Sequence, residues 1–338
     1  MNADDRSIDI SVVVIGRNEG ARLQACLGSV HAADWLGLRR ELIYVDSHSS
    51  DGSPAKARSM GAEVYGLGDA KPCAAAGRNI GWRAAQGSLV MFLDGDTLLE
   101  PGFLAQALPA LSDPCVAAVW GHRREIDPQQ SIYTRVLDLD WIFEAGRVPY
   151  FGGDALVRRD ALAAVGGFDD QLIAGEEPEL SRRLRELGWQ IEHLYTPMTR
   201  HDLAITTLRA WWLRAERAGL AYAQVAARYR RTADPLWSAE VRRNQRHAAA
   251  LLVWPLLLGL SLATLPWLGL AWLSVSLLLL RRSAQRCRWK CPQSAVLAWC
   301  YAAHSHLQQL PILLGQWRWW RLQRRRQAPS LIEYKQVS

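Results

Sequence analysis

Two aspartates that directly follow an apolar run have a spacing suited to chemistry. Asp94-Gly95-Asp96 comes after Leu89–Leu93, whose composition is that of a buried strand. A turn at this point directs both carboxylates toward one hard cation, or toward one cation and one ribose. Mg²⁺ or Mn²⁺ prefers such oxygen ligands and completes its coordination shell with diphosphate oxygens. Because the Asp-x-Asp pattern alone is more often a solvated turn, the segments around it decide its meaning.

The surrounding segments predict an α/β sheet. Short apolar runs expected to form buried strands occur at 10–15, 41–45, 63–65 and 89–93. Helices are expected between them at 21–30, 54–60 and 74–85. This alternation is typical of a doubly wound sheet, which binds its ligands at the carboxyl ends of the strands. Asp46 and Asp94 both follow a predicted strand, so we expect both at the ligand-binding edge.

Later segments continue the α/β pattern and then change character. A further strand is expected at 116–120 and helices at 131–145 and 179–187, the last opening just after Pro178, a residue tolerated in a first helical turn. Residues 208–230 predict a strongly amphipathic helix rich in Trp, Ala and Arg. Its tryptophans are expected either at a membrane face or packed on the preceding α/β domain.

Charge divides the chain into two parts. Residues 1–200 contain 20 Lys and Arg against 28 Asp and Glu, whereas residues 201–338 contain 20 against 5, and the net charge is +7. A basic region binds nucleic acid or anionic lipid, and the long apolar run within this one favours lipid over nucleic acid. The six cysteines lack paired CxxC spacing, which favours a reducing compartment. The polar start MNADDRSIDI is unlike a signal peptide, so the first domain is expected in the cytoplasm.

The apolar run at 248–280 contains no charged residue. A continuous helix of this length would reach roughly 50 Å, well beyond the ~30 Å hydrocarbon core of a bilayer. Pro266 lies near its centre, and arginines flank both ends. Positive charge on both flanks favours two half-length helices bent at Pro266, or a shallow re-entrant hairpin, with both ends on the cytoplasmic side. A buried helix pair in a soluble protein is the alternative.

Six short motifs, in this order and at suitable spacings, resemble the family 2 glycosyltransferases of the GT-A fold. They are VVVIGRN at 12–18, VDSHSSDG at 45–52, GRNIG at 77–81, FLDGD at 92–96, GGFD at 166–169 and GEEPEL at 175–180. The resemblance covers roughly residues 10–205. It implies a mixed α/β sheet with helices on both faces, a nucleotide-sugar donor and a bound Mg²⁺ or Mn²⁺.

The resemblance also implies roles for individual residues on the donor side. Asp46 would accept a hydrogen bond from the nucleotide base, with a cap in a Ser/Asp turn as its structural alternative. Arg78 would approach the nucleotide or its diphosphate, unless it is a surface arginine on its helix. Asp94 would contact the ribose or the metal, and Asp96 the metal directly. Asp154 would hydrogen-bond a sugar hydroxyl.

On the acceptor side, the family places an acidic base near Glu176-Glu177-Pro178-Glu179. Alignment on Leu180 assigns the base to Glu177, and Glu176 remains the alternative. Such a carboxylate takes a proton from the acceptor hydroxyl in a single displacement that inverts the anomeric configuration. An acidic helix start favourable to the helix dipole is the structural alternative. His201 lies where some relatives supply a third metal ligand.

These observations predict an inverting glycosyltransferase that moves one sugar to a lipid-linked or membrane-proximal glycan acceptor at the cytoplasmic face of the inner membrane. Processive members usually have Gln-x-x-Arg-Trp after the base, and the stretch at 208–214 does not match it. A nucleotidyltransferase and an inactive membrane scaffold are the alternatives. The expected parts are a catalytic domain (1–205), amphipathic interfacial helices (206–247), a transmembrane or re-entrant hairpin (248–280) and a basic, Trp-rich tail with a possible further helix (281–338).

Overall fold

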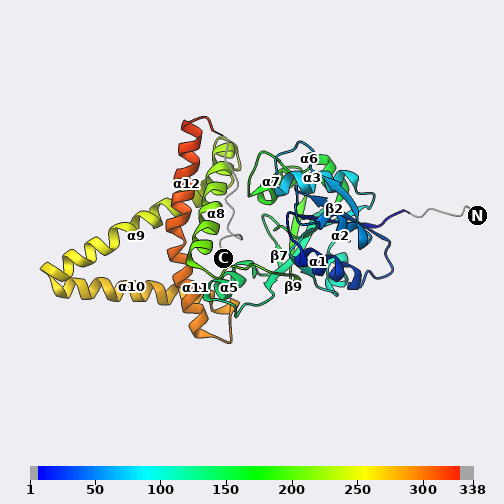
Figure 1. Ribbon diagram of the computed structural model, residues 1–338. Coiled ribbons are helices and arrows are strands. Elements are labelled where there is room, and N and C mark those ends of the chain that lie inside the picture. The colour runs from blue at the N-terminus through cyan, green and yellow to red at the C-terminus, as the bar shows by residue number, and fades with distance from the viewer. Residues whose placement is uncertain (1–6, 328–338) are drawn as a thin grey trace, which may run out of the picture. The chain divides into compact units, whose positions relative to one another are not determined.

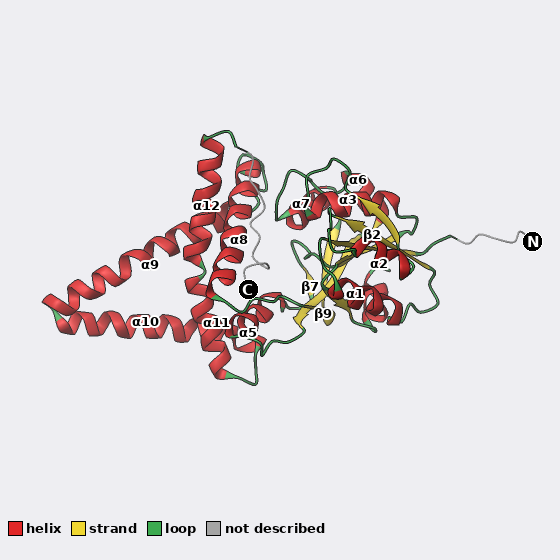
Figure 2. Ribbon diagram, viewed as in Figure 1, coloured by secondary structure: helices red, strands yellow, loops and turns green. Residues whose placement is uncertain are grey.

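A computed structural model of the chain describes residues 7–327. The chain divides into two compact units, the first made of Met1–Ile126 and Trp141–Asp202 and the second of Asp127–Asp140 and Leu203–Ser338. The described strands all belong to the first unit, and the second is helical (Figure 2). The predicted boundary at residue 205 lies close to the one at Asp202. The assignment of 127–140 to the second unit was not predicted.

The described part of the first unit is built on one sheet of nine strands. In chain order they are β1 Ile10–Gly16, β2 Arg40–Asp46, β3 Glu63–Gly66, β4 Leu89–Asp94, β5 Thr97–Leu99, β6 Val116–Glu125, β7 Gly146–Arg147, β8 Ala155–Arg158 and β9 Gln190–His201. Their order across the sheet is β3-β2-β1-β4-β8-β6-β9-β5, with β7 paired to β9. The first four strands are parallel, whereas β8 and β5 run antiparallel to their neighbours. The predicted mixed α/β sheet is therefore confirmed.

Helices cover both faces of this sheet. They are α1 Ala21–Ala32, α2 Ser53–Ser59, α3 Ala74–Ala84, α4 Phe103–Ala110, α6 Arg159–Val165 and α7 Glu176–Glu186. Figure 1 shows α3 and α6 on one side of the strands and α1 on the other. Gly81 of α3 lies so close to Val13 that an added Cβ would collide with the valine side chain. A glycine is needed there because the helix backbone itself rests on the central strand.

The second unit contains α5 Ile132–Asp138, the 3₁₀ turn Leu139–Trp141 at its border, α8 Leu208–Tyr229, α9 Ser238–Thr264, α10 Pro266–Cys287, the 3₁₀ turn Arg288–Lys290, α11 Ala295–Leu307 and α12 Gln309–Arg324. The helix expected at 131–145 is therefore shorter than predicted, and the one further helix considered possible within 281–338 is two helices, α11 and α12. Polar contacts hold the 127–140 segment in this unit. The Lys290 ammonium donates to the Leu139 carbonyl at 2.9 Å, and the Tyr301 hydroxyl to the Asp140 carboxylate at 3.0 Å.

The apolar run forms the two helices predicted on either side of Pro266. α9 ends at Thr264 and α10 begins at Pro266, so that Leu265 alone makes the turn. The two helices pack together, with the Trp254 and Trp272 rings 4.7 Å apart between centroids. Among the described helices, α9 alone is long and apolar enough to cross a membrane by length and composition. We call α9 and α10 together, over 248–280, the hairpin.

Candidate active site

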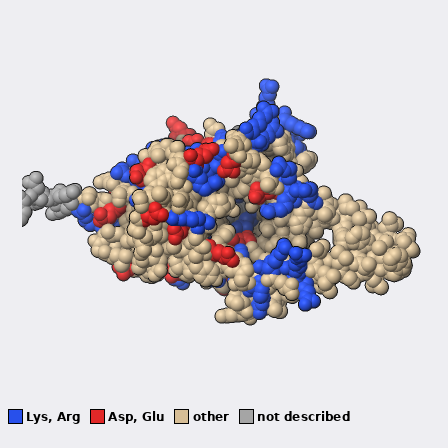
Figure 3. All heavy atoms as spheres, turned by 180° about the vertical axis from the view of Figure 1, so that it is seen from behind, with Lys and Arg blue, Asp and Glu red and all other residues tan. Residues whose placement is uncertain are grey.

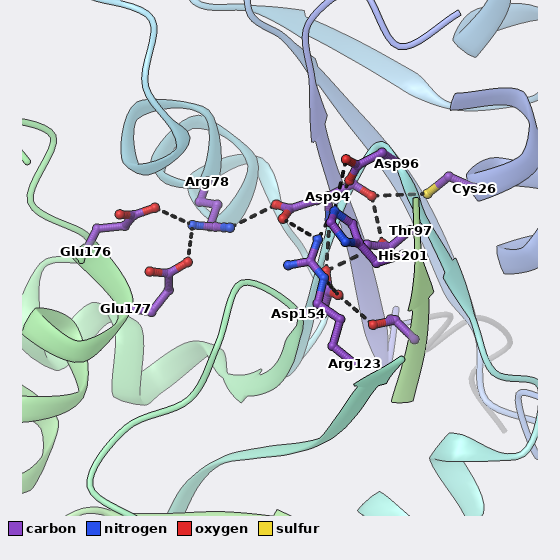
Figure 4. Close-up of polar contacts among 11 residues, drawn as sticks. Cys26, Arg78, Asp94, Asp96, Thr97, Arg123, Asp154, Glu176, Glu177 and His201 are labelled. Carbon is purple, nitrogen blue, oxygen red and sulfur yellow. Dashed lines mark hydrogen bonds and ion pairs between the residues drawn. The ribbon is translucent and has the colours of Figure 1, made fainter. Parts of the chain in front are cut away.

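The buried carboxylate of Asp154 supports the Asp94–Asp96 turn (Figure 4). β8 pairs antiparallel with β4, and this register opposes Phe92 to Ala155 and brings Asp154 beside the end of β4. The Asp94 amide donates to one Asp154 oxygen at 3.0 Å, and the Thr199 hydroxyl donates to the other at 2.6 Å. Asp154 is thus a buried support for the turn, and this geometry occupies both of its oxygens.

Strand pairing also brings His201 to the second aspartate of the turn. β5 pairs antiparallel with β9, so Thr97 lies opposite His201. His201 Nε2 is 3.2 Å from Asp96 Oδ2, and both side chains are buried. Burial, with a smaller contribution from the nearby Arg123, lowers the pKa of His201 to about 3. The imidazole is therefore neutral at physiological pH, which is the state that ligates metals.

Asp94 lies between two guanidinium groups. Arg78 Nη2 is 3.0 Å from Asp94 Oδ1, and Arg123 Nη2 is 3.1 Å from Asp94 Oδ2. Arg123 comes from β6 and also lies 3.7 Å from Asp96 and 3.6 Å from Asp154. Both Asp94 oxygens thus face positive charge, because a guanidinium group lies on either side of this carboxylate.

Arg78 joins this turn to the start of α7. The helix begins after Gly175, whose φ of 84° is a left-handed conformation that favours glycine. Arg78 Nη1 reaches Glu176 at 2.8 Å and Glu177 at 3.0 Å, and the Arg78 side chain is only 2% exposed. Burial by itself lowers the pKa of Arg78, yet the surrounding carboxylates outweigh it and raise the pKa above its usual value. The arginine therefore stays charged and links three carboxylates.

The pKa of Glu177 lies well above the ordinary value of a glutamate. Burial, reinforced by repulsion from Glu176, raises the pKa of Glu177 to about 7, although Arg78 acts in the opposite direction. A carboxyl with a pKa near neutrality is a stronger proton acceptor than an ordinary glutamate. Glu177 is also the more exposed of the two, since 15% of its side chain is accessible against 6% for Glu176. These properties favour Glu177 over Glu176 as the residue that faces an acceptor.

A second group of contacts builds the loops after β1 and β2. Asp46 accepts hydrogen bonds from the Tyr44 hydroxyl at 3.1 Å and the Ser49 amide at 2.9 Å. Asn18 accepts from the Ser50 amide at 2.7 Å, which ties the two loops together. Asp46 therefore stabilises the turn that follows β2. It does not cap α2, because the N-cap of that helix is Gly52.

The predicted metal ligands are only partly assembled. Asp96 and His201 approach each other, whereas both Asp94 oxygens face guanidinium groups. Residues 7–327 contain no group of three or more His, Cys, Asp and Glu side chains arranged to hold a metal. One carboxylate and one neutral imidazole fit a divalent ion that takes its remaining ligands from a diphosphate and water.

The family model of glycosyl transferase family 2 matches residues 11–168, which include β1, the Asp94–Asp96 turn and Asp154. The first unit is a family 2 glycosyltransferase domain.

Similar proteins agree with this assignment. The pre-mycofactocin glycosyltransferase of Mycobacterium tuberculosis is 31% identical over 246 residues, which are 68% of this chain and 50% of that protein. The beta-monoglucosyldiacylglycerol synthase of Synechocystis is 24% identical over 218 residues, or 60% of this chain and 45% of that protein. The chain thus spans about half the length of these curated relatives.

A solved structure confirms the fold over almost the whole chain. The mannosyltransferase PcManGT of Pyrobaculum calidifontis, solved in complex with GDP-Man and Mn²⁺, superposes with a TM-score of 0.68 at 19% identity. The match covers 94% of this chain and 88% of that one. At this identity the match establishes the GT-A fold and not the substrate.

The glycosyltransferase domain connects nearly all predicted site residues in one network of ion pairs and hydrogen bonds. These residues are Arg78, Asp94, Asp96, Asp154, Glu176, Glu177 and His201 (Figure 4). Asp46 stands apart, in the loop after β2. The roles of these residues in donor, metal and base chemistry stay predictions.

Two contributors to the glycosyltransferase site were missed by sequence reasoning. Arg123 bridges three aspartates and packs over the Trp141 ring, 5.8 Å from its centroid. Thr199 supports Asp154 from β9. The only available signal for Arg123 was its place after the apolar run 116–120, since its partners Asp94 and Asp154 are far away in sequence.

Proposed function

We propose that the chain is an inverting, metal-dependent glycosyltransferase that moves one sugar from a nucleotide-sugar to a lipid-linked or membrane-proximal acceptor. The observation that carries this proposal is the connection, through buried Arg78, between the Asp94 turn and Glu177. In a family 2 domain this connection joins a donor-side carboxylate to a carboxyl whose pKa is near neutrality. The chain thus has a leaving-group side and a base side.

On the donor side, Asp96 and His201 would hold the divalent ion. When bound, the ion neutralises charge on the departing nucleoside diphosphate. Arg78 and Arg123 place two further positive charges beside Asp94, where they bind and orient the same diphosphate. The complex of PcManGT with GDP-Man and Mn²⁺ supports this choice of donor and metal.

On the acceptor side, Glu177 accepts the proton of the attacking hydroxyl. The acceptor oxygen forms a bond to the anomeric carbon as the bond from that carbon to the diphosphate breaks, and the proton passes to Glu177 Oε. Because one displacement occurs at the anomeric carbon, its configuration inverts. Arg78 Nη1 holds Glu177 at 3.0 Å and Glu176 at 2.8 Å, so it positions the base for this transfer.

The proposed location is the cytoplasmic face of a membrane, where the acceptor would be found, and the exposed surface of the hairpin supports the membrane contact. Its leucines are exposed, including Leu256 at 73% and Leu270 at 61%. Exposed apolar surfaces of this extent mark contact with a membrane or a protein. The similarity to a protein named beta-monoglucosyldiacylglycerol synthase supports a lipid acceptor.

A donor screen tests the proposal. Purified full-length protein is incubated with a panel of nucleotide-sugars and Mn²⁺, and the released nucleotide product is identified. We expect nucleoside diphosphate from one donor and its loss in Asp96→Asn. Pyrophosphate as the product would indicate a nucleotidyltransferase, and no turnover with any donor would indicate an inactive scaffold.

A further inference from the structure

The base of the hairpin carries a ring of arginines. α9 contributes Arg242, Arg243 and Arg246, and α10 contributes Arg281, Arg282 and Arg286. All six are exposed, and none forms an ion pair with a residue that the structure describes. We call these six residues the arginine collar.

Contacts between helices show that the two halves of the collar lie at one level. His247 of α9 contacts His306 of α11, with His247 Nε2 2.9 Å from His306 Nδ1. Ser283 of α10 lies 3.0 Å from the other nitrogen of His306. Arg246 and Arg282 are the sequence neighbours of His247 and Ser283, so the two sets of arginines lie at a similar level of the two helices.

Acidic residues are absent from this part of the chain. Residues 241–327 contain thirteen Lys and Arg and no Asp or Glu. The hairpin beyond the collar has no charged residue at all. Figure 3 shows its projecting end entirely tan, with blue groups gathered near its base. Within the described part of the chain, the collar is therefore a set of cations without an ion-paired carboxylate, placed where an apolar segment begins.

The dimensions of the hairpin match a re-entrant segment that enters the bilayer and returns without crossing it. From His247 to Thr264 the helix rises about 27 Å, and from Pro266 to Leu280 about 22 Å, at 1.5 Å per residue. Both lengths are below the ~30 Å of a hydrocarbon core. A hairpin inserted to this depth leaves its two basic ends on the same side, at the level of the lipid headgroups.

We propose that the arginine collar binds anionic phospholipid headgroups and makes membrane attachment selective for anionic bilayers. This inference rests on the proposed membrane attachment of the hairpin and adds the lipid class. Guanidinium groups bind phosphate oxygens in a bidentate manner. Each basic residue near an anionic leaflet raises the affinity several-fold, in a salt-dependent way.

Vesicle sedimentation with the full-length protein tests the inference. Vesicles of phosphatidylcholine alone are compared with vesicles that also contain phosphatidylglycerol, at low and high salt. We expect tighter binding to the anionic vesicles, weakened by salt. The triple variant R281Q/R282Q/R286Q should lose roughly 100-fold in affinity for anionic vesicles and keep its affinity for neutral ones.

The matched control is R324Q/R325Q/R326Q, which removes three exposed arginines at the end of α12 distant from α11. A collar-specific effect leaves this control close to the wild type. Equal losses of affinity in both variants, or no preference of the wild type for anionic vesicles, would overturn the role of the collar. In either case, binding to neutral vesicles would still support the hairpin as the membrane anchor. Failure to bind any vesicle would overturn both proposals, and the hairpin would then require a protein partner.

Discussion

At the scale of single residues, Arg78 is the centre of the site. It is 2% exposed, yet its guanidinium meets Asp94, Glu176 and Glu177 at 2.8–3.0 Å. A buried cation of this kind is stable only because several carboxylates compensate its desolvation. Prediction from sequence placed Arg78 near the diphosphate, and the structure adds its contact with both candidate bases. Arg78 thus contacts the carboxylates that we propose for the acceptor side and for the donor side.

The two glutamates at the start of α7 are distinguished by substitution. Glu177→Gln should lower turnover by roughly 10²–10⁴-fold, the usual contribution of a general base, with donor binding retained. Glu176→Gln should retain more activity, because Glu176 is the more buried partner of Arg78. Turnover and donor titration are measured for both variants. A larger loss of turnover in Glu176→Gln than in Glu177→Gln would assign the base to Glu176.

The raised pKa of Glu177 predicts the pH dependence of turnover. The base acts in its ionised form, so turnover at saturating donor should rise as the pH increases through about 7. The pKa is above the value of 4.5 in a free side chain, so protonation favours the folded state. The stabilising contribution is complete below about 4.5 and is lost as the pH rises through about 7. A profile of turnover against pH that is flat across neutrality would contradict the assignment of Glu177 as the base.

At the scale of elements, the site depends on how closely α3 packs on β1. Gly81→Ala should destabilise the protein by about 1–3 kcal/mol, because the added methyl group collides with Val13. Gly28→Ala in α1 is the control, since nothing lies within 4 Å of its added Cβ. It should stabilise the helix by up to about 1 kcal/mol. Urea unfolding measures the free energy of unfolding of both variants. Equal values would contradict the close contact between α3 and β1.

The elements could be predicted to the extent that local pattern determines them. The apolar runs at 10–15 and 89–93 became the central strands β1 and β4, and Pro266 marked the hairpin turn. Two arrangements depend instead on contacts between distant residues. The pairing of β9 with β5 brings His201 to Asp96. The assignment of 127–140 to the second unit depends on contacts with residues some 150 positions later in the chain. Local periodicity contains no signal for either.

The same limit applies to the site. Asp94, Asp96 and Glu177 could be identified because they stand in short motifs beside predicted elements. Arg123 could not, because its significance comes from meeting Asp94 and Asp154 across the sheet. The predicted hydrogen bond from Asp154 to a sugar hydroxyl stays a prediction, and what the sequence did not indicate is that its oxygens accept hydrogen bonds from the Asp94 amide and from Thr199.

At the scale of the whole molecule, a family 2 domain is joined to a basic helical unit with an apolar hairpin. The hairpin leucines are exposed where a soluble protein would bury them. We therefore expect the double variant L256Q/L270Q to keep its fold and to lose at least about 10-fold in bilayer affinity, since burial of one leucine contributes about 1.5–3 kcal/mol. Vesicle sedimentation measures the loss.

The control for this prediction is Leu187→Gln, which changes a leucine that is 58% exposed in the first unit. It should bind vesicles as the wild type does. If it loses as much affinity as the hairpin variant, the effect is one of general surface polarity and the hairpin is not the anchor.

We propose that this chain transfers a sugar from a nucleotide-sugar and releases the nucleoside diphosphate. The most direct measurement uses a donor labelled separately in its sugar and its nucleotide, incubated with membranes, Mn²⁺ and the purified protein. We predict that the sugar label moves into the lipid-linked or glycan fraction in equal amounts to the nucleoside diphosphate released, and that Asp96→Asn abolishes both. Nucleotide label in the product, or undiminished transfer by Asp96→Asn, would contradict the account.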